Sequence, residues 1–167
     1  MRVLRRLGFG AVALWLMVSA GLAEEIRFGD GGSIHGGATW TITPNDHVRF
    51  DAYSFDGSLA AREGWVWDNR DAKVGHITFA IPGAFASAAE IVREGLGGIG
   101  AAPDYQSDCV DAGSLIMEVA ADGVSYKGYL DNCAGQDGAP ADVKAHYLAL
   151  RAVQAEIVTV LGLDRLQ

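Results

Sequence analysis

Apolar and polar residues alternate along much of the first half of the chain, as they do in strands that bury one face. Trp40 and Ile42 alternate with threonines, residues 44–46 have turn composition, and apolar positions resume at Val48 and Phe50. This pattern predicts a β-hairpin over residues 39–55, with Tyr53 and Phe55 on the face opposite Val48 and Phe50.

A second strand pair is predicted immediately downstream. Trp65 and Trp67 share one face of a short strand, residues 68–75 are polar turn material, and Ile77, Phe79 and Ile81 share one face of the next strand. The alternation at Ile26 and Phe28 offers a fifth strand. Together these segments indicate an antiparallel meander with one buried face.

The period changes to that of a helix at Ala84. Apolar residues then recur every three or four positions, and Gly95 supplies an expected stop. After a long surface connection, Asp122-Gly123 separates two alternating runs and predicts another hairpin. Pro140 and Gly162 bracket a final helix. The stripe of that helix comprises Val143, Tyr147, Leu150, Val153 or Gln154, Ile157 and Leu161.

These elements predict one α+β domain over residues 24–167: an antiparallel sheet built from hairpins, covered by two amphipathic helices and carrying one disulfide. Leu150 is expected inside and Arg151 in solvent. Residues 39–96 and 115–162 share a hairpin-then-helix order and suggest a weak pseudo-repeat. The plainer alternative is that hairpins and helices are common parts of such domains.

The first 23 residues have the pattern of a signal peptide. Arg2, Arg5 and Arg6 precede an apolar run, and Gly21-Leu22-Ala23 places small residues where a signal peptidase cleaves. Cleavage after Ala23 and a periplasmic or secreted location are expected. The alternative is an uncleaved membrane anchor, since the charge-free run reaches the lower limit of a bilayer span.

The charge balance is acidic, with 13 Lys and Arg against 21 Asp and Glu and a net charge of -8. Without residues 1–23 the balance becomes 10 against 21, or -11. Such a chain repels nucleic-acid phosphates and attracts basic proteins or peptides. After signal cleavage no membrane partner is expected.

The two cysteines predict one disulfide, Cys109–Cys133, because an exported chain matures in an oxidising compartment. A loop of this length contributes about 3 kcal/mol in the chain-entropy model. A catalytic thiol is the alternative, and the even cysteine count disfavours it.

Oxygen ligands gather around both cysteines. Asp104, Asp108, Asp111 and Asp131 form a candidate calcium site, with solvated loop acids as the alternative. The four histidines lack zinc-ligand spacing. The Gly-x-Gly-x-x-Gly run at 95–100 closes a helix instead of opening one, so no dinucleotide cofactor is expected.

Exposed aromatic side chains are the remaining functional signal. Tyr53, Phe55, Trp65 and Trp67 are the candidate binding residues, and no nucleophile motif accompanies them. The sequence therefore favours an exported acidic binding protein of the bacterial envelope that engages a basic protein or peptide. The alternatives are a small periplasmic hydrolase using carboxylates and a calcium-stabilised structural protein.

Overall fold

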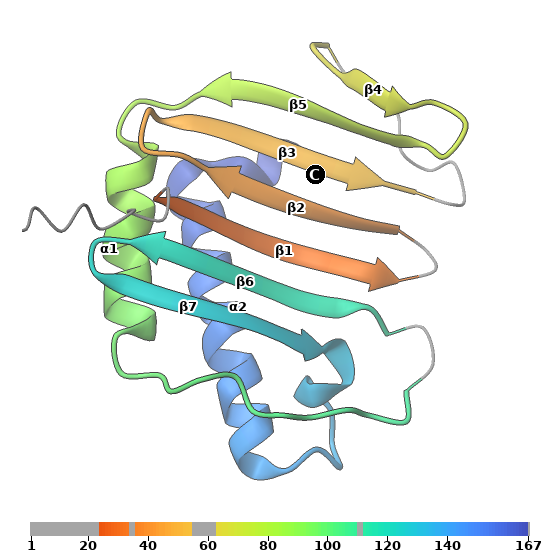
Figure 1. Cartoon of the computed structure of the whole chain (residues 1–167), viewed down its shortest axis with the longest axis vertical. Coiled ribbons are helices and arrows are strands. Elements are labelled where there is room, and N and C mark those ends of the chain that lie inside the picture. The colour runs from red at the N-terminus through yellow and green to blue at the C-terminus, as the bar shows by residue number, and fades with distance from the viewer. Residues whose placement is uncertain (1–23, 34–35, 55–62, 110–111, 167) are drawn as a thin grey trace, which may run out of the picture.

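The computed structural model describes residues 24–33, 36–54, 63–109 and 112–166, so the expected signal peptide lies outside the described residues. Seven antiparallel strands form one sheet in the order β4-β5-β3-β2-β1-β6-β7 (Figure 1). The strands are β1 (Glu25–Ser33), β2 (Gly36–Ile42), β3 (His47–Tyr53), β4 (Val66–Asn69), β5 (Val74–Ala80), β6 (Ser114–Ala121) and β7 (Val124–Asp131). The expected α+β class is confirmed.

The expected meander is interrupted at two places. β5 lies between β3 and β4, so the second hairpin adds to the sheet through its later strand. β1 is an interior strand, paired with β2 on one side and with β6 on the other. The segment around Ile26 and Phe28 therefore joins the two parts of the sheet. The side chains of both residues are buried.

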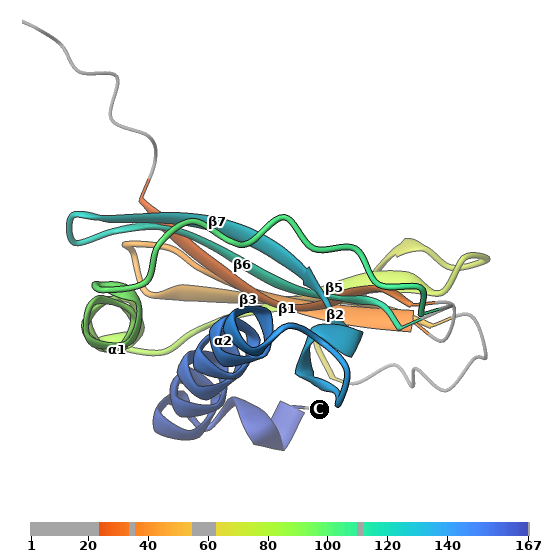
Figure 2. The same ribbon diagram turned by 90° about the horizontal axis from the view of Figure 1, so that it is seen from below.

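Both long helices cover the same face of the sheet (Figure 2). They are α1 (Ala84–Leu96) and α2 (Ala141–Leu161), and α2 ends at Gly162 in the left-handed conformation, as expected. Two short 3-10 helices, η1 (Asn132–Gly135) and η2 (Leu163–Leu166), flank α2. None of the described helices is long and apolar enough to span a membrane.

Alternation along the strands sorts the side chains onto the two faces. Phe28, Trp40, Phe50, Met117 and Leu130 are at most 5% exposed and face the helices. Leu150 of α2 packs against this layer and is fully buried, which confirms its expected position. None of the described helices lies over the opposite face, which is called the open face below.

Gly95 does not end α1, contrary to the expectation from sequence. The helix continues to Leu96, and Gly95 lies where α1 approaches α2. A Cβ atom built on Gly95 would be 2.3 Å from Cγ2 of Val153. The glycine therefore permits close packing of the two helices.

A side chain of the β2–β3 turn caps α1 from the sheet. The carboxylate of Asp46 accepts backbone hydrogen bonds from Gly83 (2.8 Å) and Phe85 (3.1 Å). These bonds lower the pKa of Asp46, the bond from Gly83 having the larger effect. They satisfy amide groups that the first turn of a helix leaves unpaired.

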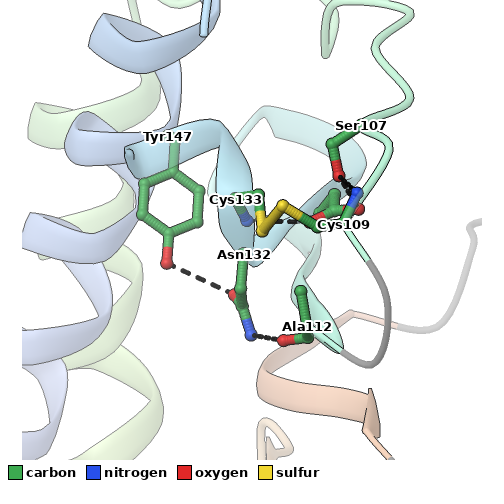
Figure 3. The surroundings of a disulfide bond; sticks show 7 residues. Ser107, Cys109, Ala112, Asn132, Cys133 and Tyr147 are labelled. Atoms are coloured by element: carbon green, nitrogen blue, oxygen red, sulfur yellow. Dashed lines mark hydrogen bonds between the residues drawn. A yellow bond between two sulfur atoms is a disulfide. The ribbon is translucent and has the colours of Figure 1, made fainter. Parts of the chain in front are cut away.

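The disulfide Cys109–Cys133 is present and fastens the long connection between α1 and β6 to η1 (Figure 3). Asn132 reinforces the link by donating to the carbonyl of Ala112 (2.9 Å) and accepting from the Tyr147 hydroxyl of α2 (3.3 Å). The connection runs along the β7 side of the sheet (Figure 1, Figure 2). Ser107 there donates to Asp131 at the end of β7 (2.6 Å).

Arg151 does not point into solvent, and the expectation that it would is wrong. Its guanidinium forms a two-pronged pair with Asp30 of β1 (2.5 and 2.8 Å) and also donates to Tyr147 and Asn132. Asp30 follows Ile26 and Phe28 on the helix-facing side of β1, which places a carboxylate at the margin of the core. Arg151, one turn after Tyr147, is the residue that reaches it.

Gly95→Ala tests the helix contact. The added methyl group should destabilise the fold by about 1–3 kcal/mol through overpacking against Val153, although alanine is favoured over glycine in a helix by about 0.5–1 kcal/mol. Urea denaturation measures the difference. Gly98→Ala is the control, because nothing lies within 4 Å of its built Cβ. A Gly95→Ala protein as stable as the wild type would contradict the close contact.

Arg151→Ala tests the polar link between α2 and the sheet. Loss of hydrogen bonds to a charged group costs about 1.5–3 kcal/mol, and the unfolding free energy should fall by that amount. Arg93→Ala on α1 is the control, because Arg93 forms only longer, exposed ion pairs (3.5 and 3.7 Å) and should change stability little. Equal effects of the two substitutions would argue against a structural role for Arg151.

Candidate functional site

The open face carries a row of polar side chains that runs across five strands. Arg27 of β1 is paired with Thr41 of β2, which is paired with Arg49 of β3. On the other side of β1, Arg27 is paired with Glu118 of β6, which is paired with Lys127 of β7. The row therefore holds three cations and one carboxylate in a protein that is acidic as a whole.

Glu118 is shared by three neighbours. It accepts hydrogen bonds from the Tyr129 hydroxyl, from Lys127 (2.9 Å) and from Arg27 (3.1 Å). The bond from Tyr129, followed by that from Lys127, lowers the pKa of Glu118 to about 2. Glu118 thus stays ionised. Its single negative charge is shared by two cations, Arg27 and Lys127.

Arg49 is held by Asp51, two residues along the same strand. Its Nε lies 2.9 Å from both carboxylate oxygens of Asp51, and its Nη2 lies 2.7 Å from one of them. This hydrogen bonding raises the pKa of Arg49. The side chains of Arg49 and Arg27 are 45% and 40% exposed, respectively.

Glycines leave the middle of the open face without side chains. A Cβ on Gly37 would be 2.8 Å from the Tyr53 ring, and one on Gly31 would be 2.8 Å from Cδ1 of Ile116. Tyr53 and Ile116 therefore lie over the glycine positions of β2 and β1, respectively. Gly29, two residues before Gly31 on β1, has a φ of 147°, which side-chain-bearing residues rarely adopt.

Arg27, Thr41 and Arg49 of this row line one hollow of about 470 Å³, together with Gly37. Its lining comprises Glu25, Arg27, Gly37, Ala38, Thr39, Thr41, Arg49, Asp51, Ala52, Tyr53, Val74 and Ile116. This volume is within the range of small-ligand sites. Thr39 and Ile116 at its floor are only 9% exposed, although no helix lies on this face.

The lining groups are suited to binding. Arginine donates hydrogen bonds and keeps its charge, so it does not act as a general base toward the threonine hydroxyls. The carboxylates that line the hollow are Glu25 and Asp51, and Asp51 is already bound by Arg49. The hollow thus offers fixed donors, hydroxyls and apolar surface to a ligand.

The aromatic candidates from the sequence are divided between the two faces. Tyr53 lines the hollow, whereas Trp65 and Trp67 lie on the helix side, in edge contact with each other and, through Trp65, with Phe50. Lys73 lies over the Trp67 ring at 5.9 Å. Phe55 is outside the described residues. The four residues therefore do not form one patch.

The described residues of the candidate calcium site do not form one cluster of ligands. Asp131 accepts hydrogen bonds from Ser107 and from the Cys133 amide, so both of its oxygens have protein partners. Asp104 and Asp108 are exposed in the connection, and Asp111 is outside the described residues. In the described part of the chain, the groupings of three metal-ligand side chains contain neither Asp104 nor Asp108.

One such grouping was not expected from sequence: Asp51, Asp68 and His76, on β3, β4 and β5. Asp68 lies at an irregularity of the β4–β5 pairing and approaches His76 Nδ1 to 2.7 Å. Arg49 lies 2.7 Å from Asp51 and 3.9 Å from Asp68. A guanidinium already supplies the positive charge that a metal ion would bring.

Sequence reasoning did not identify the hollow. The alternation placed Arg49, Asp51 and Tyr53 on a common face, but the contribution of Arg27 depends on β1 being adjacent to β2. The run of glycines between residues 29 and 37 was the available signal, because strands rarely contain glycine without a close backbone approach or a bulge.

Comparison with known proteins assigns no family to this chain. No family model matches it, and no curated protein or solved structure has significant similarity to it.

Proposed function

We propose that this chain is an exported binding protein of the bacterial envelope that takes up a basic peptide segment on the open face of its sheet. The observation that carries the proposal is the hollow of about 470 Å³, lined by charged, hydroxyl and apolar groups on a face that no helix covers.

The other surfaces of the sheet are less suited to a partner. α1 and α2 cover the opposite face. The β7 edge has the disulfide-tethered connection beside it, and the β4 edge is four residues long with an irregular register. Short or protected edges of this kind oppose strand addition. The open face remains as the extended docking surface.

The charge of the protein supports a basic partner. The chain without residues 1–23 has 10 basic and 21 acidic side chains, so its long-range field attracts cations. Glu25 lines the hollow and receives a basic side chain of a bound segment, while Tyr53 and Ile116 contact its apolar side chains. A hydrolase is less well supported, because Asp51 is already neutralised by Arg49.

Export predicts a specific product. The intact mass of the protein recovered from the envelope fraction should correspond to a chain that starts at Glu24 and has two hydrogens fewer than the reduced form. Recovery of the full N-terminus would overturn the signal-peptide proposal and favour an anchored chain.

Peptide binding is tested by titrating isotope-labelled protein with a peptide of alternating lysine and alanine, amidated at its C-terminus, and following amide chemical shifts. The shifts should concentrate on β1, β2 and β3. Affinity should fall as salt rises from 0.1 to 1 M, since the screening length falls from about 10 to about 3 Å.

Tyr53→Ala should weaken the binding of this peptide by at least about fivefold, as expected for an interface aromatic. Leu148→Ala is the matched control, because Leu148 is 52% exposed on α2, away from the hollow. A glutamate-alanine peptide that binds equally well, or shifts confined to the helices, would contradict the proposal.

A further inference from the structure

We infer that the Arg27–Thr41–Arg49 row is a receptor for the C-terminal carboxylate of a peptide lying in the hollow. The inference rests on the proposed function and specifies which part of the peptide is recognised. It is argued from the placement of two arginines that line the hollow on either side of one threonine.

The first step is the spacing. Thr41 is directly paired with both arginines, so Arg27 and Arg49 stand two strands apart, or about 9.5 Å between backbones. In the unbound protein Arg27 contacts Glu118 of β6, and Arg49 contacts Asp51 and approaches Asp68. Both side chains are long enough to turn toward one carboxylate above Thr41, whose hydroxyl adds a donor. Planar guanidinium groups match the geometry of a carboxylate.

The second step is the number of donors already in use. The Arg27 hydrogen bond to Glu118 uses Nη1, and those of Arg49 to Asp51 use Nε and Nη2. Each guanidinium has five N–H groups, so both retain donors for an incoming ligand. Because Glu118 is shared with Lys127, it does not by itself balance the charge of Arg27.

The third step concerns what precedes the carboxylate. From the arginine row the hollow continues along the strands past Thr39 to Tyr53. Tyr53 is four residues after Arg49 on β3, which corresponds to about 13 Å along the strand. This distance accommodates the residues just before a C-terminus. At this end Tyr53 lies over Gly37 and Ile116 lies over Gly31. These two side chains contact an apolar side chain of the peptide.

The net negative charge of the protein opposes the binding of a free carboxylate. A protein of this charge repels a carboxylate at long range, and an amidated peptide has one more unit of positive charge than its free acid. The long-range field therefore favours the amide. A preference for the acid has to come from local donors.

The experiment compares the lysine-alanine peptide, extended by a C-terminal leucine, as the free acid and as the amide. Wild-type protein should bind the free acid about tenfold more tightly, the scale of charge-assisted hydrogen bonds made to one carboxylate. Arg27→Gln and Arg49→Gln should each reduce this ratio toward one. Lys127→Gln should keep the ratio, because Lys127 belongs to the same row but does not line the hollow.

The outcomes separate the two proposals. Equal binding of acid and amide by the wild type, or a ratio that survives in both arginine variants, overturns the carboxylate receptor and leaves the peptide-binding function standing. Failure of both peptides to bind overturns the function itself. Arg27→Lys and Arg49→Lys keep the positive charge without the planar fork, so retention of the full ratio in both would show that charge alone suffices and would overturn the geometric argument.

Discussion

One-sided burial is the constraint on which the rest of the structure depends. Seven strands turn their apolar residues toward one face, and two helices cover that face, with Trp40, Met117 and Leu150 at the centre. An antiparallel sheet tolerates water on its other face because its backbone groups are paired within the sheet. The open face is therefore free to carry charged residues, and any ligand contact there does not compete with packing of the core.

Glycine permits close packing of neighbouring side chains on both faces of the sheet. At Gly95 the absent side chain admits Val153 and brings the two helices together. At Gly31 and Gly37 the absent side chains let Ile116 and Tyr53 lie down over the sheet and leave a hollow beside them. The same physical property serves packing on one face and the candidate site on the other.

The sequence predicts most elements of this fold because two-residue and three-to-four-residue periods are local properties. The hairpin at Asp122-Gly123, the stripe of α2 and the pairing of Cys109 with Cys133 are all confirmed. The strand order is not a local property, because the pattern of residues 24–33 does not indicate that β1 will lie between β2 and β6. For the same reason the partner of Arg151 was missed, since Asp30 lies 121 residues away, and so was the row through Arg27.

The distribution of charge links the fold to the proposed function. Three basic side chains, Arg27, Arg49 and Lys127, lie in a single row of the open face, although the chain as a whole has a large excess of acids. Cross-strand pairs of opposite charge stabilise a sheet by at most about 1 kcal/mol each, and a row with three cations and one carboxylate is not the arrangement that maximises such pairs. Arg49 is already paired with Asp51, two residues along β3, and Glu118 is shared by Arg27 and Lys127. The guanidinium N–H groups that these pairs leave unused are donors for a carboxylate that arrives with the ligand.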